Sequence, residues 1–351
     1  MIRFLCKAVR CQPTIKKKWG LMPTLMLPLI LTCSSLLIVA TLGGSPVSAA
    51  PLVSLEAPVT VARGDAFVAM AVSNEPVQSF SFKWMGKNYA ATAYTGEASS
   101  GAEKKWQAVI LLPVPLDAKE NDLTVAVAPI TGQTGGKKSM AAGQAVTQNI
   151  RLYNKERPVQ QLTVDKKYVD PPAAQMERIK ADRELVRKTL AQYSPERQWT
   201  LPFERPVSGD VSSLFGLKRV FNGQPRGLHR GLDLRGAEGT PILACADGKV
   251  ALTGNLYFSG NVVYINHGEG VFTAYLHMSK ILVEKNQLVR KGDVIGLVGA
   301  TGRVTGPHLH LSLLVQGVSV DPQPFIPAAT GSEKKVPTSA DQPSQAPKMG
   351  K

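Results

Sequence analysis

Residues 248–277 read GKVALTGNLYFSGNVVYINHGEGVFTAYLH, in which three apolar runs are separated by short turns. The runs cover 248–253, 261–267 and 272–277, and each has the length of a strand rather than of an ordinary helix. Tight connections between the runs are marked by glycines at 254, 260, 268 and 270. Successive strands joined by such turns predict an antiparallel sheet.

The same pattern continues to the end of the apolar sequence. Further strands are expected at 294–298 and 308–315, again with glycines between them. We therefore predict a C-terminal antiparallel β domain over residues 201–327. The tail at 328–351 is rich in Ser, Lys, Pro and Gln and is expected to be disordered.

A second β region is expected over residues 51–158. Phe80, Phe82 and Trp84 alternate with polar residues, as in a strand with one buried face. Short strands without helices between them favour a small β-sandwich, so the predicted fold class is mainly β. This region contains no histidine and no other catalytic candidate.

Residues 159–200 are predicted to be a linker and a helix. Apolar residues recur at helical spacing after Pro172, namely Met176, Ile179, Val186, Leu190 and Tyr193. We interpret this helix as a connecting element whose apolar stripe packs on a domain. The alternative is a regulatory arm that crosses the active-site cleft.

The chain holds five histidines, and all of them fall within about 80 residues of the C-terminal β region. They are His229, His267, His277, His308 and His310. Such clustering in an otherwise strand-rich domain indicates a common site.

Two short motifs give this cluster the chemistry of a metal site. His229 and Asp233 lie four residues apart in HRGLD, and His308 and His310 lie two apart in HLH. On an extended chain each pair projects from one face. A catalytic zinc site uses three nitrogen or oxygen ligands and a water, so one of the four groups is left to act on the water. His277 would line the same cleft if its strand neighbours 308–315.

The residues that carry a family resemblance extend from about 212 to 325. They include SSLFGLKR (212–219), the HRGLD motif, GNVVYINHGEGVFTAYLHMS (260–279), and VRKGDVIGLVGATGRVTGPHLHLSLL (289–314). This stretch resembles the lysostaphin-type, or LytM-type, zinc metallo-endopeptidases. The resemblance includes the turn glycines as well as the histidines. The helical His-Glu-x-x-His motif of another metalloprotease class is absent.

By this resemblance, His229, Asp233 and His310 are the ligands of a Zn²⁺ cofactor. His308 and His277 are the catalytic histidines, one taking a proton from the attacking water and the other donating to the developing oxyanion. Which of the two is the formal base stays open. His267 is interpreted as structural. The resemblance also suggests that the substrate cleft is lined by Arg219, Asn222 and Tyr275.

The implied function is hydrolysis of peptide cross-links in bacterial peptidoglycan. Peptidoglycan peptides are then the expected partner, with a regulatory envelope protein as a second one. The alternative is a non-catalytic activator of a cell-wall amidase. Degenerate relatives of that kind usually lack metal-site residues, whereas this chain lacks none.

Residues 1–50 are predicted to be a targeting segment. A basic stretch ends at Lys18, an apolar run of 22 residues follows at 21–42, and Ser48-Ala49-Ala50 resembles a signal cleavage site. The segment is either a cleaved signal peptide or an inner-membrane anchor. In both cases the remainder is exported to the periplasm or cell envelope, with membrane contact only through this segment.

The charge of the chain is consistent with an envelope location. Lys and Arg number 41 against 26 Asp and Glu, and six of the basic residues fall in 1–50. The exported part is therefore still basic and suited to anionic polymers. We find no aromatic-basic motif, so nucleic acid is not an expected partner.

Overall fold

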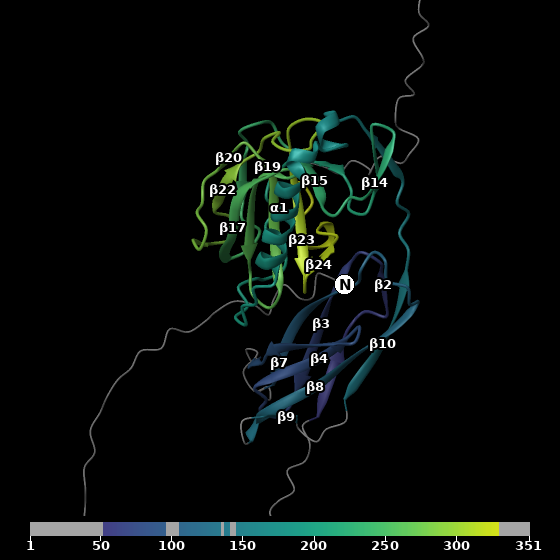
Figure 1. Ribbon diagram of the computed structural model, residues 1–351. Coiled ribbons are helices and arrows are strands. Elements are labelled where there is room, and N and C mark those ends of the chain that lie inside the picture. Colours follow the sequence, from purple (N-terminus) through teal and green to yellow (C-terminus); the bar gives the residue numbers. More distant parts are fainter. Residues whose placement is uncertain (1–51, 96–104, 135–136, 141–144, 330–351) are drawn as a thin grey trace, which may run out of the picture.

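The computed structural model describes residues 52–95, 105–134, 137–140 and 145–329 (Figure 1). Within these ranges the chain is mostly β, with one α-helix, which confirms the predicted fold class. No helix in the described part is long and apolar enough to cross a membrane. The predicted targeting segment and nearly all of the predicted tail lie outside the described residues.

The N-terminal region forms two sheets. One has the strand order β1-β3-β7-β6, and the other has the order β2-β10-β8-β4-β5 with β9 attached to β8. The strands are β1 (Val53–Glu56), β2 (Thr60–Ala62), β3 (Ala66–Ser73), β4 (Ser79–Trp84), β5 (Lys87–Thr92), β6 (Tyr94–Thr95), β7 (Trp106–Pro113), β8 (Asp122–Thr134), β9 (Lys137–Met140) and β10 (Val146–Tyr153).

Alternation along these strands fills one hydrophobic core. Phe80, Phe82 and Trp84 of β4 are almost completely buried, whereas Lys83 between them is exposed. They pack with residues of β3, β7, β8 and β10. The indole nitrogen of Trp84 donates to the carbonyl oxygen of Pro113 at 2.8 Å, so its burial leaves no donor unpaired.

The connecting segment contributes both a strand and the α-helix. β11 (Val159–Leu162) pairs in parallel with β13 (Lys218–Phe221), which also pairs with β14 (Gln224–Leu228). Two 3₁₀ turns (Lys166–Tyr168 and Ala173–Gln175) lead to α1 (Met176–Leu190). The segment is therefore built into the C-terminal region.

The C-terminal region is organised around an eight-stranded sheet of order β12-β15-β23-β19-β18-β17-β21, with β24 attached to β23. A three-stranded sheet, β16-β22-β20, accompanies it. Their strands are β12 (Val211–Ser213), β15 (Leu232–Arg235), β16 (Pro241–Leu243), β17 (Gly248–Leu256), β18 (Gly260–Asn266), β19 (Val271–Met278), β20 (Lys280–Ile281), β21 (Leu288–Val289), β22 (Val294–Leu297), β23 (His308–Val315) and β24 (Val318–Val320). A last 3₁₀ turn covers Gln323–Phe325.

The two faces of the large sheet have different roles. Leu309 and Leu311 of β23 belong to the main core, which also contains residues of the three-stranded sheet. The even-numbered residues of β23 point to the opposite face of the sheet. There Leu314 packs with Val186 and Leu190 of α1. In Figure 1, α1 runs across this sheet. The helix thus covers one end of the face that carries His308 and His310 at the other end, and the connecting-helix interpretation fits this packing.

The N-terminal and C-terminal regions contact each other through polar and apolar groups. Leu111 and Ala66 of the N-terminal sheets belong to the same hydrophobic cluster as the C-terminal core. Lys155 pairs with Asp65 at 2.7 Å and with Asp321 at 3.4 Å, which joins the two regions.

Glu269 is a buried carboxyl at this contact. It lies in the hairpin between β18 and β19, only 4% exposed, and one carboxylate oxygen has no hydrogen-bond partner. Burial raises its pKa to about 7, although Arg197 and the backbone of Thr92 oppose the shift. Burial, and after it the charge of Glu269, raises the pKa of Tyr193. Ionisation of Glu269 therefore destabilises the folded state.

This cost predicts a pH-dependent stability. Between the unfolded pKa near 4.5 and the folded pKa near 7, the folded state retains a proton that the unfolded state has lost. Stability from this group is therefore present below pH 4.5 and lost as the pH rises through 7, by up to about 3 kcal/mol. We expect Glu269→Gln to be more stable than the wild type at pH 8, with a smaller difference at pH 5. Denaturant unfolding of both proteins measures this, and a pH-independent difference would contradict it.

Candidate functional site

The pairing of β15 with β23 positions the first two residues of the site. The strands are antiparallel, with Asp233 opposite His310 and Arg235 opposite His308. The flanking Leu232 and Leu234 are fully buried in the main core. Because side chains alternate along a strand, their burial directs Asp233 to the other face, where it meets His310.

His229 reaches the same point from the segment between β14 and β15. It lies just outside the assigned strands, but its backbone still pairs with that of Gly216 and Leu217. Gly231 makes this approach possible. A Cβ atom at that position would lie 2.3 Å from Nε2 of His310, so any side chain would collide with the imidazole.

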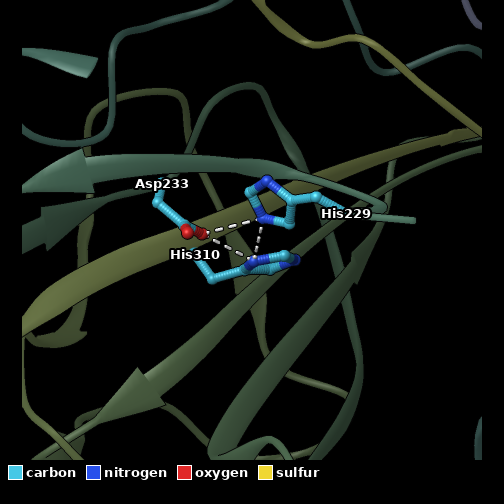
Figure 2. A group of neighbouring side chains, drawn as sticks. All are labelled: His229, Asp233 and His310. Atoms are coloured by element: carbon cyan, nitrogen blue, oxygen red, sulfur yellow. Dashed lines mark hydrogen bonds and ion pairs between the residues drawn. The ribbon is translucent and has the colours of Figure 1, made fainter. Parts of the chain in front are cut away.

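Figure 2 shows the three side chains converging on one point. His229 Nε2 lies 3.0 Å from Asp233 Oδ1, and His310 Nδ1 lies 2.8 Å from the same oxygen. The two nitrogens are 3.0 Å apart. All three residues are buried.

Hydrogen bonds on the outer side of the group set the orientation of each imidazole. His229 Nδ1 lies 2.7 Å from the carbonyl oxygen of Leu214 and must donate to it, so Nε2 keeps its lone pair. The hydroxyl of Ser312 donates to the carbonyl oxygen of Arg230 and accepts from His310 Nε2 at 2.9 Å. His310 Nδ1 therefore also keeps its lone pair.

Arg219 holds the carboxylate of the group. Its guanidinium donates to Asp233 Oδ2 at 2.5 Å and to Ser213 Oγ at 3.1 Å. One carboxylate oxygen is thus fixed by Arg219, and the other faces the two imidazoles. Outer partners of this kind orient metal ligands in proteins.

The pKa shifts agree with an anionic Asp233 beside a neutral His310. Burial raises the pKa of Asp233, but the close approach of His229 and His310 outweighs it and holds the pKa well below its usual range. Burial lowers the pKa of His310 to about 4 against the opposing effect of Asp233.

The residues of the group fit a metal ion. Two imidazole lone pairs and a carboxylate oxygen point at one another from 2.8 to 3.0 Å, an arrangement that repels unless a cation lies between them. Ligands of a tetrahedral zinc, at about 2.0–2.1 Å from the ion, lie about 3.3 Å apart, close to these separations. His229, Asp233 and His310 could therefore hold a metal ion.

His308 and His277 lie beside this group. Their ring centroids are 5.1 Å apart, and that of His277 is 5.9 Å from that of His310. His308 Nε2 is 3.8 Å from Asp233 Oδ1. In both residues Nδ1 is 2.8 Å from a backbone carbonyl oxygen, of Gly306 for His308 and of Thr301 for His277, which leaves Nε2 as the free acceptor.

A β-bulge directs His277 to this place. β19 neighbours β23 as the sequence argument required, but Tyr275, two residues before His277, faces the opposite side in the main core. Simple alternation would send His277 there too. The register with β18 shifts between Asn261 and Val263, and His277 has a φ of 66°. The bulge re-aims the side chain, as bulges near functional sites often do.

Of the three residues suggested to line the cleft, only Arg219 does so. Tyr275 is fully buried, and its hydroxyl is bonded to the backbone nitrogen of Cys245 and to Thr273, so the prediction for it is wrong. Asn222 forms two hydrogen bonds with the backbone of Val164, which fasten the segment after β11, and it does not line the cavity.

His267 lies apart from the group. It is fully buried, with Nδ1 bonded to the carbonyl oxygen of Asp247 and Nε2 to the hydroxyl of Thr273. Both ring nitrogens are occupied within the core, and burial lowers its pKa to about 4.

Comparisons with known proteins point to one family. Residues 227–322 match the model of peptidase family M23. The peptidoglycan DD-endopeptidases ShyA and ShyC of Vibrio cholerae are 35% and 42% identical over 196 and 131 residues, covering 55% and 36% of this chain. These matches span 41% and 30% of the two relatives, less than half of either.

A solved structure extends the likeness beyond the matched domain. The crystal structure of a candidate peptidase M23 from Pseudomonas aeruginosa is similar with a TM-score of 0.52 and 28% identity. The match covers 75% of this chain and 94% of that chain, so it includes more than residues 227–322.

The geometry predicts different metal binding in two histidine variants. We expect His310→Ala to lower the affinity for Zn²⁺ by more than about 100-fold. Removal of a residue that only hydrogen-bonds to a metal ligand already lowers metal affinity about 10- to 100-fold. His308→Ala should keep one Zn²⁺ per chain, because its ring is not in the converging group. Metal titration followed by elemental analysis measures both. Equal zinc content in the two variants would contradict the assignment of His310, and not His308, as a metal ligand.

Proposed function

We propose that this chain, whose residues 227–322 match the model of peptidase family M23, is a zinc-dependent endopeptidase that hydrolyses peptide cross-links of bacterial peptidoglycan. One observation carries the proposal. Two imidazole nitrogens and a carboxylate oxygen converge within 2.8–3.0 Å, and two further histidines stand beside them with free acceptor nitrogens.

His229, Asp233 and His310 would hold the zinc ion. This set leaves one coordination position for water or substrate, as in catalytic rather than structural zinc sites. Bound zinc supplies Lewis-acid chemistry, which makes water nucleophilic near neutral pH and polarises a carbonyl group. Arg219 keeps Asp233 oriented by holding its second oxygen.

His308 and His277 would do the proton chemistry. Each is anchored through Nδ1 to a backbone carbonyl, so its Nε2 is held in place as acceptor or, once protonated, as donor. One imidazole accepts the proton of the attacking water. The other then donates to the oxygen on which negative charge develops.

The relatives indicate the substrate class. Two of them are named peptidoglycan DD-endopeptidases, and a Neisseria meningitidis relative is named a DD-carboxypeptidase/endopeptidase. Peptidoglycan lies outside the cytoplasm, which agrees with the targeting segment predicted at 1–50. We therefore propose that the chain acts in the periplasm or cell envelope on peptides cross-linked through diaminopimelate.

Zinc-loaded protein is predicted to convert purified cross-linked muropeptide dimers into monomers. Chelation should abolish the reaction and added zinc should restore it. His308→Ala should lower turnover about 100- to 10,000-fold, the usual effect of a lost proton-transfer group, while its metal content stays unchanged. Liquid chromatography with mass spectrometry of the digests measures all three results.

A matched control is Arg187→Gln, an exposed substitution on α1 that should leave turnover unchanged. Zinc-loaded protein that is inert on dimers and on whole sacculi would contradict the proposal. If an Asp233→Ala variant then still stimulated a cell-wall amidase, the non-catalytic activator would take its place.

A further inference from the structure

A cavity of about 200 Å³ opens beside the proposed zinc ligands. Asp233 and His308 line it on the side of the site, and Gln160 of β11 lines it from the connecting segment. Gln160 is held there because its side-chain oxygen accepts from Ser213 Oγ at 2.9 Å. A peptide at the site would therefore extend into a cavity with defined walls.

The cavity is strongly cationic. Arg219, Arg235 and Arg303 line it, and Asp233 is the one acidic residue among its lining residues. Arg219 already pairs with Asp233. Arg303 forms no ion pair or side-chain hydrogen bond with any residue that the structure describes.

Arg303 is nevertheless held rigidly. Its guanidinium carbon lies 4.6 Å from the ring centroid of Phe221 and 4.8 Å from that of Phe258. Cation–π contacts of this kind hold the guanidinium without using its N–H donors, so its N–H edge stays available. A preorganised, unpaired donor edge at the wall of a cavity is suited to a planar anion such as a carboxylate.

The electrostatic environment also favours an anion. Burial, followed by repulsion from Arg219 and Arg226, lowers the pKa of Arg303 to about 10. The side chain still carries its charge at neutral pH, but without a counter-charge. An incoming carboxylate would relieve this repulsion and gain charge-assisted hydrogen bonds.

We propose that Arg303, assisted by Arg235, binds a free carboxylate of the substrate next to the scissile bond. The inference rests on the proposed function and specifies its substrate. In a diaminopimelate cross-link the leaving nitrogen stands on a carbon that carries a free carboxylate, whereas a glycine bridge has none there. Arg303 is thus a specificity-determining residue that selects the diaminopimelate type.

The test uses two zinc-loaded proteins and two matched peptides. In one peptide the leaving residue has a free carboxylate, and in the other the same group is a carboxamide. For the wild type we expect kcat/KM to be about 10- to 100-fold higher on the carboxylate peptide, the range of a charge-assisted hydrogen bond. In Arg303→Gln the ratio should fall to within about 3-fold of one, by loss on the carboxylate peptide alone.

Two further variants separate charge from folding. Arg303→Lys keeps the charge and should retain part of the preference, and Arg187→Gln, outside the cavity, should retain all of it. A wild-type ratio near one would overturn the proposal. An equal loss on both peptides in Arg303→Gln would assign Arg303 a structural role and overturn it as well.

A binding measurement keeps this test independent of turnover. The amine product of cleavage, with either carboxylate or carboxamide, is titrated calorimetrically into zinc-loaded wild type and Arg303→Gln. The carboxylate form should bind the wild type at least about 10-fold more tightly than the variant, whereas the carboxamide form should not distinguish them. If Arg303→Gln kept the preference for the carboxylate form, that preference would come from the metal ion, and the proposal would be overturned. If the protein hydrolysed neither peptide but still bound the carboxylate product more tightly through Arg303, only the proposed function would be refuted.

Discussion

The site depends on the antiparallel pairing of β15 with β23. This register sets Asp233 opposite His310, while the leucines on either side of each residue enter the main core. A slip of either strand by one residue would turn its polar side chain into that core and its leucines out of it. The burial of apolar side chains on one face therefore fixes the distance between polar groups on the other.

Around this pairing, the chain orients groups whose lone pairs face one another. Backbone carbonyls hold the outer nitrogens of His229, His277 and His308, and Arg219 holds the outer oxygen of Asp233. Such a site is preorganised for a cation, because the ligands are already oriented in the folded protein before the cation binds. Arg303 is held in place as well, by cation–π contacts with two aromatic rings.

The sequence predicted the mainly β fold, because periodicity is a local signal. Residue type and spacing singled out four candidate ligands, and the choice of His229, Asp233 and His310 among them came from the resemblance. The sequence could not predict features set by tertiary contacts. The bulge that turns His277 has no local signature, and simple alternation would have placed this residue in the core beside Tyr275. Tyr275 was assigned to the cleft by resemblance, but its hydroxyl is used inside the core. The stacking of Arg303 on Phe221 joins segments far apart in sequence.

The most direct measurement is a zinc-edge anomalous difference map from crystals of the zinc-loaded protein. One peak is predicted within about 2.0–2.2 Å of His229 Nε2, His310 Nδ1 and Asp233 Oδ1, with an open fourth position towards His308 and His277. A peak elsewhere, or a fourth protein ligand that closes the site, would contradict the account.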